Sequence, residues 1–195
     1  GGYEEERWWH DLVKPEPEAP EWPQPNRPRT NVDWYEAIAF CRWLSLRLGL
    51  NDSAISLPTK QQWEKSARGE QGLIYPWGNE YRTGYANVDE TKQRVGRWNL
   101  KQTTAVGMYP QGKSLYGICD LSGTVWEWCL NKIDSDIVTP DRSGDERVLR
   151  GGSWNYPPND ARSVTRHRLH PESRHLNRGF RLVSSYKGDR FILKT

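Results

Sequence analysis

Residues 123–129 read Gly-Thr-Val-Trp-Glu-Trp-Cys, and residues 150–154 read Arg-Gly-Gly-Ser-Trp. The first stretch predicts a short strand, whose alternation of side chains places at least one of Trp126 and Trp128 in the core. In the second stretch, the paired glycines allow a positive φ or a close approach of two backbone segments. Together they predict a core of large aromatic rings joined by tight turns.

A helix is predicted upstream, from Asp33 to Leu48. Asp33 and Glu36 form a capping box, and Gly49 stands where a helix C-terminal glycine is expected. Apolar residues recur between these ends at helical spacing. Cys41 lies on that apolar face, so we expect a buried structural residue rather than a reactive thiol.

The remaining regular structure is predicted to be short. A second helix begins at Thr59, which with Gln62 forms another capping box, and ends before Gly69. Beyond it, turn-forming residues recur every few positions, which is typical of a compact, loop-rich architecture. The final strands are predicted at Arg147–Leu149 and Phe180–Val183.

Three regions are predicted along the chain. Residues 1–27 include a stretch, positions 14–25, in which proline recurs among charged and polar residues, and this predicts an extended arm. Tryptophans of this arm are expected to anchor it across the domain: Trp8, Trp9 and Trp22. The domain itself is assigned to residues 28–183, and residues 184–195 form a C-terminal tail.

Composition excludes several classes of protein. Only 35% of the 195 residues are hydrophobic and the mean hydropathy is −0.93, yet 11 tryptophans and 9 tyrosines can build a core. No apolar run approaches the ~18 residues of a membrane span, and no signal peptide is evident, so no membrane partner is expected. Three cysteines cannot all pair within one chain, which predicts a reducing, cytoplasmic setting.

Charge is unevenly distributed. The whole chain carries a net charge of +3, but residues 147–181 contain eight arginines and only two acidic residues. This basic segment is either a solvated face or a surface for an acidic partner. A nucleic-acid partner is not expected, because the segment has no lysine and no known nucleic-acid-binding motif.

Six motifs follow one another in an order that identifies a family. They are Asn31–Ala37, Leu57–Thr59 with Trp63-Glu64, Tyr75–Gly78, Gly123–Cys129, Arg150–Trp154 and Gly179–Arg181. Together they resemble the formylglycine-generating-enzyme (sulfatase-modifying factor) family over residues 28–183. The resemblance implies an α+β fold, a variant of the C-type lectin fold. Two helices, small twisted antiparallel sheets and much irregular chain are expected, with Arg181 in a structural ion pair or bound to carbonyl groups.

The resemblance does not extend to the family's chemistry. Formylglycine-generating enzymes oxidise a substrate cysteine with two cysteines that hold copper, and alignment places those positions at Pro158 and Ser163. Copper(I) needs soft thiolate ligands, and no cysteine follows Cys129. We therefore expect no copper, no catalytic residues and no enzymatic activity. The alternative is a diverged oxidase of this type or another metalloenzyme.

Two other kinds of metal site are suggested by the residues. The resemblance implies a structural calcium ion on backbone carbonyls and one carboxylate, from Ser122, Gly123, Val125 and Glu127. The family's second calcium site needs an aspartate where this chain has Trp98. Three histidines suggest zinc as an alternative: His167, His170 and His175. Against it, Pro171 interrupts any helix that would align the first two.

The composition of residues 155–183 is anomalous. Lys, Glu, Gln, Met and Trp together occur there once, as Glu172, although about six are expected in 29 residues from the whole chain. Substitution of the adenines in an asparagine codon cannot produce those five types. This bias resembles that of the variable proteins of diversity-generating retroelements, in which adenine-directed reverse transcription rewrites such a segment. Ordinary drift in an Arg- and Asn-rich loop is the alternative.

A diversified segment at residues 155–178 predicts a non-catalytic domain that binds a macromolecular ligand, and we expect that ligand to be a protein. The variable ligand-binding positions are Tyr156, Asn159, His167, Leu169, His170, Ser173, His175, Leu176 and Arg178. The framework positions are Arg150, Gly151, Gly152, Trp154, Arg162, Arg166, Gly179, Phe180 and Arg181. The chain opens on Gly1-Gly2 without a methionine, and the resemblance allows an upstream effector domain.

Overall fold

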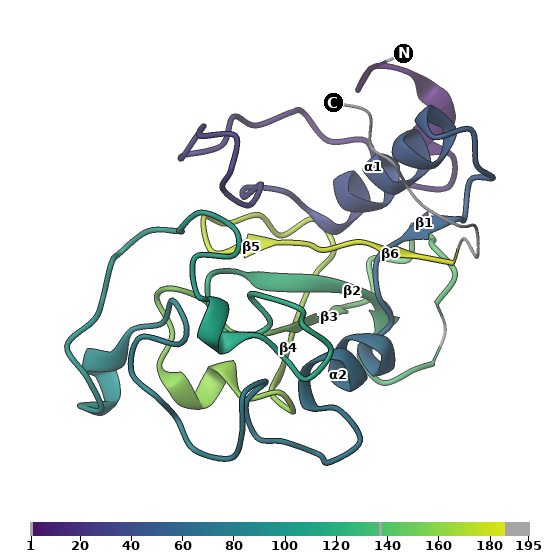
Figure 1. Ribbon diagram of the computed structural model, residues 1–195. Coiled ribbons are helices and arrows are strands. Elements are labelled where there is room, and N and C mark those ends of the chain that lie inside the picture. Colours follow the sequence, from purple (N-terminus) through teal and green to yellow (C-terminus); the bar gives the residue numbers. More distant parts are fainter. Residues whose placement is uncertain (1, 137, 186–195) are drawn as a thin grey trace.

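The computed structural model describes residues 2–136 and 138–185 (Figure 1). Its α-helices are α1 (Trp34–Arg47) and α2 (Lys60–Arg68). Its strands are β1 (Ile55–Ser56), β2 (Trp126–Lys132), β3 (Arg147–Arg150), β4 (Arg166–Leu169), β5 (Arg178–Gly179) and β6 (Val183–Ser184). Four 3₁₀ turns complete the described elements: η1 (Glu6–Trp9), η2 (Glu90–Gln93), η3 (Pro110–Gly112) and η4 (Pro158–Ala161).

Both predicted helices are confirmed, together with their capping boxes. The Asp33 carboxylate accepts the Glu36 N–H at 2.8 Å, and the Glu36 carboxylate accepts the Asp33 N–H at 3.0 Å. Thr59 and Gln62 make the same reciprocal pair at the start of α2, at 3.1 and 2.8 Å. Each pair satisfies amide donors that a helix N-terminus leaves without intrahelical partners, which explains why both helices begin where the sequence predicts.

The main sheet has the strand order β4-β3-β2-β5. β3 is antiparallel to both β2 and β4, whereas β5 is parallel to β2. A second sheet consists of β1 and β6, which are antiparallel. The strand predicted at Phe180–Val183 is wrong except at its last residue: the pairing falls at β5, before it, and at β6, which begins at Val183. Between these two strands, the Arg181 guanidinium hydrogen-bonds to the Glu127 carboxylate, and this contact interrupts the strand pairing.

The two helices cover opposite faces of the main sheet (Figure 1). On the α1 face, Trp126, Trp128 and Leu149 pack with the helix in one buried cluster. On the α2 face, Cys129 and Val148 pack against side chains of α2 in another. Both tryptophans of the central strand are therefore buried, because residues two apart in a strand share a face.

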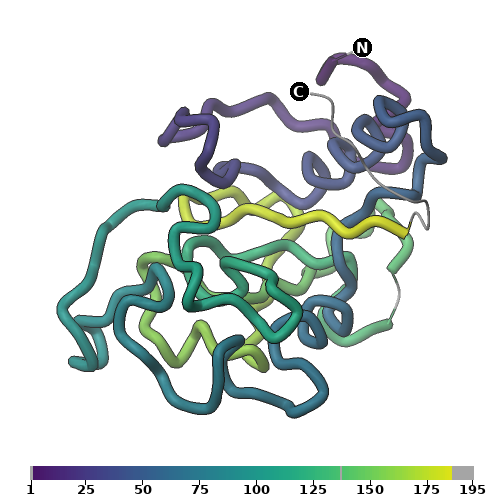
Figure 2. The backbone as a smooth tube through the Cα atoms, viewed as in Figure 1, coloured from purple at the N-terminus to yellow at the C-terminus, as the bar shows by residue number. Residues whose placement is uncertain are grey.

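The N-terminal segment runs beside α1 (Figure 2). It is not extended throughout, because η1 forms a 3₁₀ turn that places Trp8 and Trp9 in the α1 cluster. Further along, Trp22 packs edge-on against Trp154 with ring centroids 5.9 Å apart. Of the predicted tail, residues 186–195 lie outside the described part. In the part that is described, no helix is both long and apolar enough to cross a membrane.

Candidate functional site

The positions that the resemblance assigns to a catalytic thiol pair are both buried. Pro158 begins η4, and Ser163 follows that turn. The three cysteines, all free, lie elsewhere: Cys41 and Cys129 are buried, and Cys119 is half-buried. Burial raises the pKa of the Cys41 thiol to about 12 and raises that of Cys129 as well, so neither is a ready thiolate.

The predicted calcium ligands do not form a vacant oxygen site. Both carboxylate oxygens of Glu127 accept hydrogen bonds from Arg181, at 2.5 and 2.6 Å, and one also accepts the Trp63 indole N–H at 2.5 Å. The Gly123 carbonyl already accepts the Val125 N–H at 2.9 Å. The only anionic member is thus already neutralised by a guanidinium, which would repel a cation. These residues do not fit calcium.

Arg181 instead matches the structural role that the sequence predicts. It donates to the carbonyls of Cys119 and Asp120 as well as to Glu127. The glycine pair also matches: Gly151 and Gly152 have φ of 97° and 73°, and a Cβ on Gly152 would lie 2.9 Å from the Ala161 backbone. Each glycine is required where β3 leads into residues 155–178.

The proposed histidine trio is dispersed. The ring of His167 lies against Trp126, His170 approaches Gly144, and His175 is paired with the side chain of Asn177. Across residues 2–136 and 138–185, no three His, Cys, Asp or Glu side chains are grouped to hold a metal ion. The histidines therefore act separately in this surface.

Residues 155–178 follow a path that leaves most of their side chains on the surface. The segment passes through η4, forms the edge strand β4, crosses the end of α1 and returns as β5 at the opposite edge of the sheet. Every one of the nine predicted ligand-binding side chains is exposed or half-buried. By contrast, two predicted framework residues, Arg162 and Arg166, are exposed and do not belong to the packed frame.

Two of the nine predicted positions contact one buried ring, and a third lies beside it in the sheet. Tyr156 and His167 each meet Trp126 edge-on with ring centroids 5.5 Å apart. Arg178 pairs with Trp126 across the parallel strands β5 and β2, so both side chains lie on the same face. We call these four residues the Trp126 cluster. The remaining positions lie around it on β4 and the crossing loop, except Asn159, which lies in η4 and contacts Gln93 and Arg162.

Two anchors inside the segment were not singled out from the sequence. Arg174 ion-pairs with Asp33, Glu36 and Glu18 and is only 13% exposed. Asn177 is buried and donates to Asn155 at 2.9 Å. The sequence did contain a signal for Arg174. The capping box of α1 has two carboxylates, and once these are buried they require a cation nearby. Nothing local distinguishes Asn177 from its neighbours.

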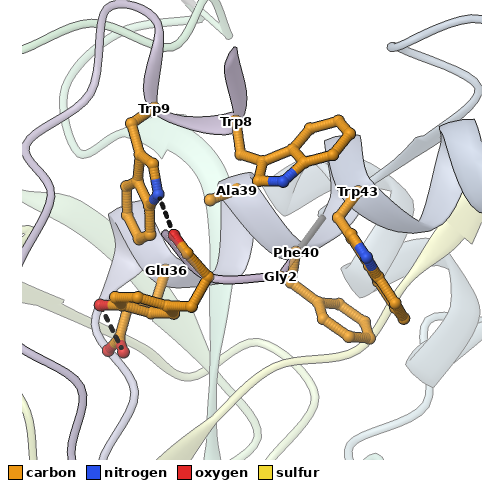
Figure 3. A pocket seen from close by; sticks show the side chains of 8 residues that line it. Gly2, Trp8, Trp9, Glu36, Ala39, Phe40 and Trp43 are labelled. Atoms are coloured by element: carbon orange, nitrogen blue, oxygen red, sulfur yellow. Dashed lines mark hydrogen bonds between the residues drawn. The ribbon is translucent and has the colours of Figure 1, made fainter. Parts of the chain in front are cut away.

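A separate apolar hollow lies between the N-terminal segment and α1 (Figure 3). It has a volume of about 330 Å³ and is lined mainly by aromatic side chains: Tyr3, Trp8, Trp9, Phe40 and Trp43. Its one carboxylate, Glu36, is held by the Asp33 amide, by Arg174 and by the Tyr3 hydroxyl. None of its lining residues falls within residues 155–178.

Comparisons with known proteins identify the family of the chain. The model of the sulfatase-modifying factor enzyme 1-like domain matches residues 2–186. The chain is 33% identical over 166 residues to the inactive C-alpha-formylglycine-generating enzyme 2 of Bos taurus, covering 80% of this chain and 50% of that protein. It is 30% identical over 218 residues to the hercynine oxygenase of Mycobacterium tuberculosis, covering 94% of this chain and 48% of that protein.

Among solved structures, the Treponema denticola variable protein 1 superposes with a TM-score of 0.66 at 27% identity. The match covers 86% of this chain and 74% of that one. The fold predicted from the motifs is confirmed. The chain spans about half the length of the curated relatives it matches.

Proposed function

The chain belongs to the sulfatase-modifying factor enzyme 1-like domain family, and we propose that it is a non-catalytic member that binds protein ligands through residues 155–178. One observation carries the proposal. All nine side chains predicted to vary are exposed or half-buried, while the segment is held by buried groups such as Arg174 and Asn177. Substitutions at exposed positions cost little stability, so this arrangement suits a surface that is rewritten.

Diversification by a retroelement is the second part of the proposal. It is supported by the bias of residues 155–183 against Lys, Glu, Gln, Met and Trp. It is also supported by the likeness to a solved variable protein. A rewritten surface has no fixed ligand, which favours macromolecular ligands that a face of several side chains can cover.

Absence of catalysis is the third part. The chain has proline and serine where the resemblance places the copper-binding cysteines, and its similarity to an inactive relative supports this. Other relatives, such as the hercynine oxygenase, are named as enzymes. A direct assay decides between them: the copper-loaded protein should form no formylglycine in a cysteine peptide, and measurable turnover would contradict the proposal.

Binding is tested with two displayed libraries of matched size. The first randomises Tyr156, His167, Leu169, His170, His175, Leu176 and Arg178. The second randomises seven exposed residues on the α2 side: Gln61, Lys65, Glu70, Gln71, Lys113, Leu115 and Tyr116. Both are selected against lysozyme, streptavidin and ubiquitin.

The first library should yield folded, target-specific clones for at least one protein, and the second should yield none. Equal yields from the two libraries, or binders from the second alone, would show that residues 155–178 are not a specialised binding surface. Circular dichroism of random clones checks that each library folds.

A further inference from the structure

We infer that the Trp126 cluster binds a carboxylate, so that the protein ligand inserts an aspartate or glutamate side chain there. The inference rests on the proposed function of residues 155–178 and names the chemical group that they recognise. Four observations carry it: an unpaired guanidinium, a second cation from outside the segment, an unpaired buried indole N–H, and the absence of an acceptor with negative charge.

Arg178 is a half-buried cation without a partner. Among the described residues its guanidinium makes no ion pair and no hydrogen bond, and burial lowers its pKa. Four other buried or half-buried arginines meet carboxylates: Arg147 with Asp141, Arg150 with Glu64, Arg174 with Glu36 and Arg181 with Glu127. A partly desolvated guanidinium carries a free-energy cost that an incoming carboxylate would remove.

Lys92 adds a second positive charge from η2, outside the diversified segment. Its ammonium donates to the carbonyl of Asn155 at 2.6 Å and lies 5.8 Å from the centroid of the Tyr156 ring. It too has no carboxylate partner among residues 2–136 and 138–185. Like Trp126, Lys92 is therefore a constant contributor to the site, whereas Tyr156, His167 and Arg178 are predicted to vary.

Trp126, at the base of the cluster, contributes a hydrogen-bond donor that has no acceptor. Trp126 is only 3% exposed, and its indole N–H has no hydrogen-bond partner in the described structure. Burial of an unsatisfied donor is unfavourable unless an acceptor arrives or neighbouring rings move to admit one. Tyr156 and His167, which cover Trp126 edge-on, are the side chains whose movement would expose it.

Among residues 2–136 and 138–185, no carboxylate is paired with Arg178, Lys92 or the Trp126 indole N–H. Asp89 approaches through its backbone, whose N–H donates to the Tyr156 carbonyl at 2.9 Å. Its carboxylate already accepts from the amide and hydroxyl of Thr91. Because the cluster has one guanidinium fork among aromatic rings, it suits a single carboxylate better than a doubly charged phosphate.

The test uses small aromatic anions as probes, followed by the indole and guanidinium N–H signals in ¹H–¹⁵N spectra. Benzoate carries the proposed group, benzamide is its neutral counterpart, and phenyl phosphate represents the nucleic-acid or phosphopeptide alternative. The variants are Arg178→Met, Arg178→Lys, Lys92→Met and, as a control in the same segment, Arg162→Met. Thermal melts establish that each variant folds.

Benzoate should bind saturably and shift the Trp126 indole signal, whereas benzamide should bind at least about tenfold more weakly. Arg178→Met should weaken benzoate binding by at least about tenfold, Lys92→Met and Arg178→Lys by less, and Arg162→Met should leave it unchanged. Equal binding of benzoate and benzamide, unchanged binding in Arg178→Met, or a preference for phenyl phosphate would overturn the inference. If the libraries still yield protein binders, the proposed function survives that failure.

Discussion

Glu127 illustrates how a single buried side chain acquires its role from its neighbours. Its carboxylate lies between the Arg181 guanidinium and the Trp63 indole N–H, and the residue is 4% exposed. Pairing on both oxygens compensates the cost of burying a charge. The same residue type on an open turn would be a calcium ligand, so the local sequence alone does not distinguish the two roles.

Replacing Glu127 by glutamine should lower the free energy of unfolding by about 3 kcal/mol, because it leaves the Arg181 charge without its partner. Urea denaturation monitored by circular dichroism measures this. The control is Glu146→Gln at an exposed pair with Arg168, which should change stability by less than about 1 kcal/mol. Calcium and EGTA should give the same Tm. A calcium-dependent rise in Tm that Glu127→Gln abolishes would show that the turn binds the ion after all.

At the scale of elements, the N-terminus of α1 and the crossing loop stabilise each other. Asp33 and Glu36 form the capping box, and Arg174 lies 3.4 Å from one carboxylate and 3.1 Å from the other. In addition, the Pro171 carbonyl accepts the Trp34 N–H at 2.9 Å. The loop between β4 and β5 is thus held to the helix at its start, which leaves its outward side chains free to vary.

The pKa of Asp33 predicts a pH dependence of this contact. Burial raises its pKa to about 7, and the nearby Arg174 only partly opposes the shift. Because the folded pKa lies above the unfolded one, this carboxyl favours folding most below about pH 4, and that contribution is lost as the pH rises to about 7. Asp33→Asn retains a capping oxygen but cannot ionise.

We expect the stability of Asp33→Asn relative to the original chain to increase as the pH rises from about 4 to 8. Urea denaturation of both proteins across this range measures the difference. Asp52→Asn, at an exposed site beyond α1, serves as the control and should show no such trend. If Asp33→Asn instead loses stability as the pH rises, the ion pair with Arg174 dominates over burial.

At the scale of the whole molecule, the central strands of the sheet are packed in the core, whereas the edge strands carry positions that we propose to vary. The α1 and α2 clusters bury the central strands, while β4 lies at the edge with alternating exposed and half-buried side chains. The crossing loop then carries the chain to β5 at the other edge. Residues 155–178 therefore lie along both edges of the main sheet and not in its packed centre.

Replacing His167, Leu169, His170, His175 and Leu176 together should leave the fold intact. Each exposed substitution should cost about 0.5 kcal/mol or less, with a larger share from Leu169, which packs partly against the α1 cluster. Thermal melting and near-ultraviolet circular dichroism test this. The comparison is Leu149→Ala, a single change at a fully buried residue, which should cost about 2–5 kcal/mol. Loss of the near-ultraviolet spectrum in the five-fold variant would place these residues in the core.

Local sequence alone accounts for the helices, the glycine turns and the family of the fold. Capping boxes, apolar periodicity and paired glycines act over a few residues, so their effects can be worked out from neighbouring positions. The bias of residues 155–183 is likewise a property of composition. The replacement of the last predicted strand by two short strands, β5 and β6, was not predictable, because the contact between Arg181 and Glu127 spans 54 residues of chain.

The tertiary structure alone decided how the candidate site is assembled. It brought Tyr156 from the loop before η4, His167 from β4 and Arg178 from β5 around Trp126, and it added Lys92 from η2. It also placed Glu127 in an ion pair with Arg181, and Arg174 in an ion pair with Glu36 of the α1 capping box. The physical reason is that charge pairing and desolvation depend on distance in space, and residues far apart in the chain set those distances.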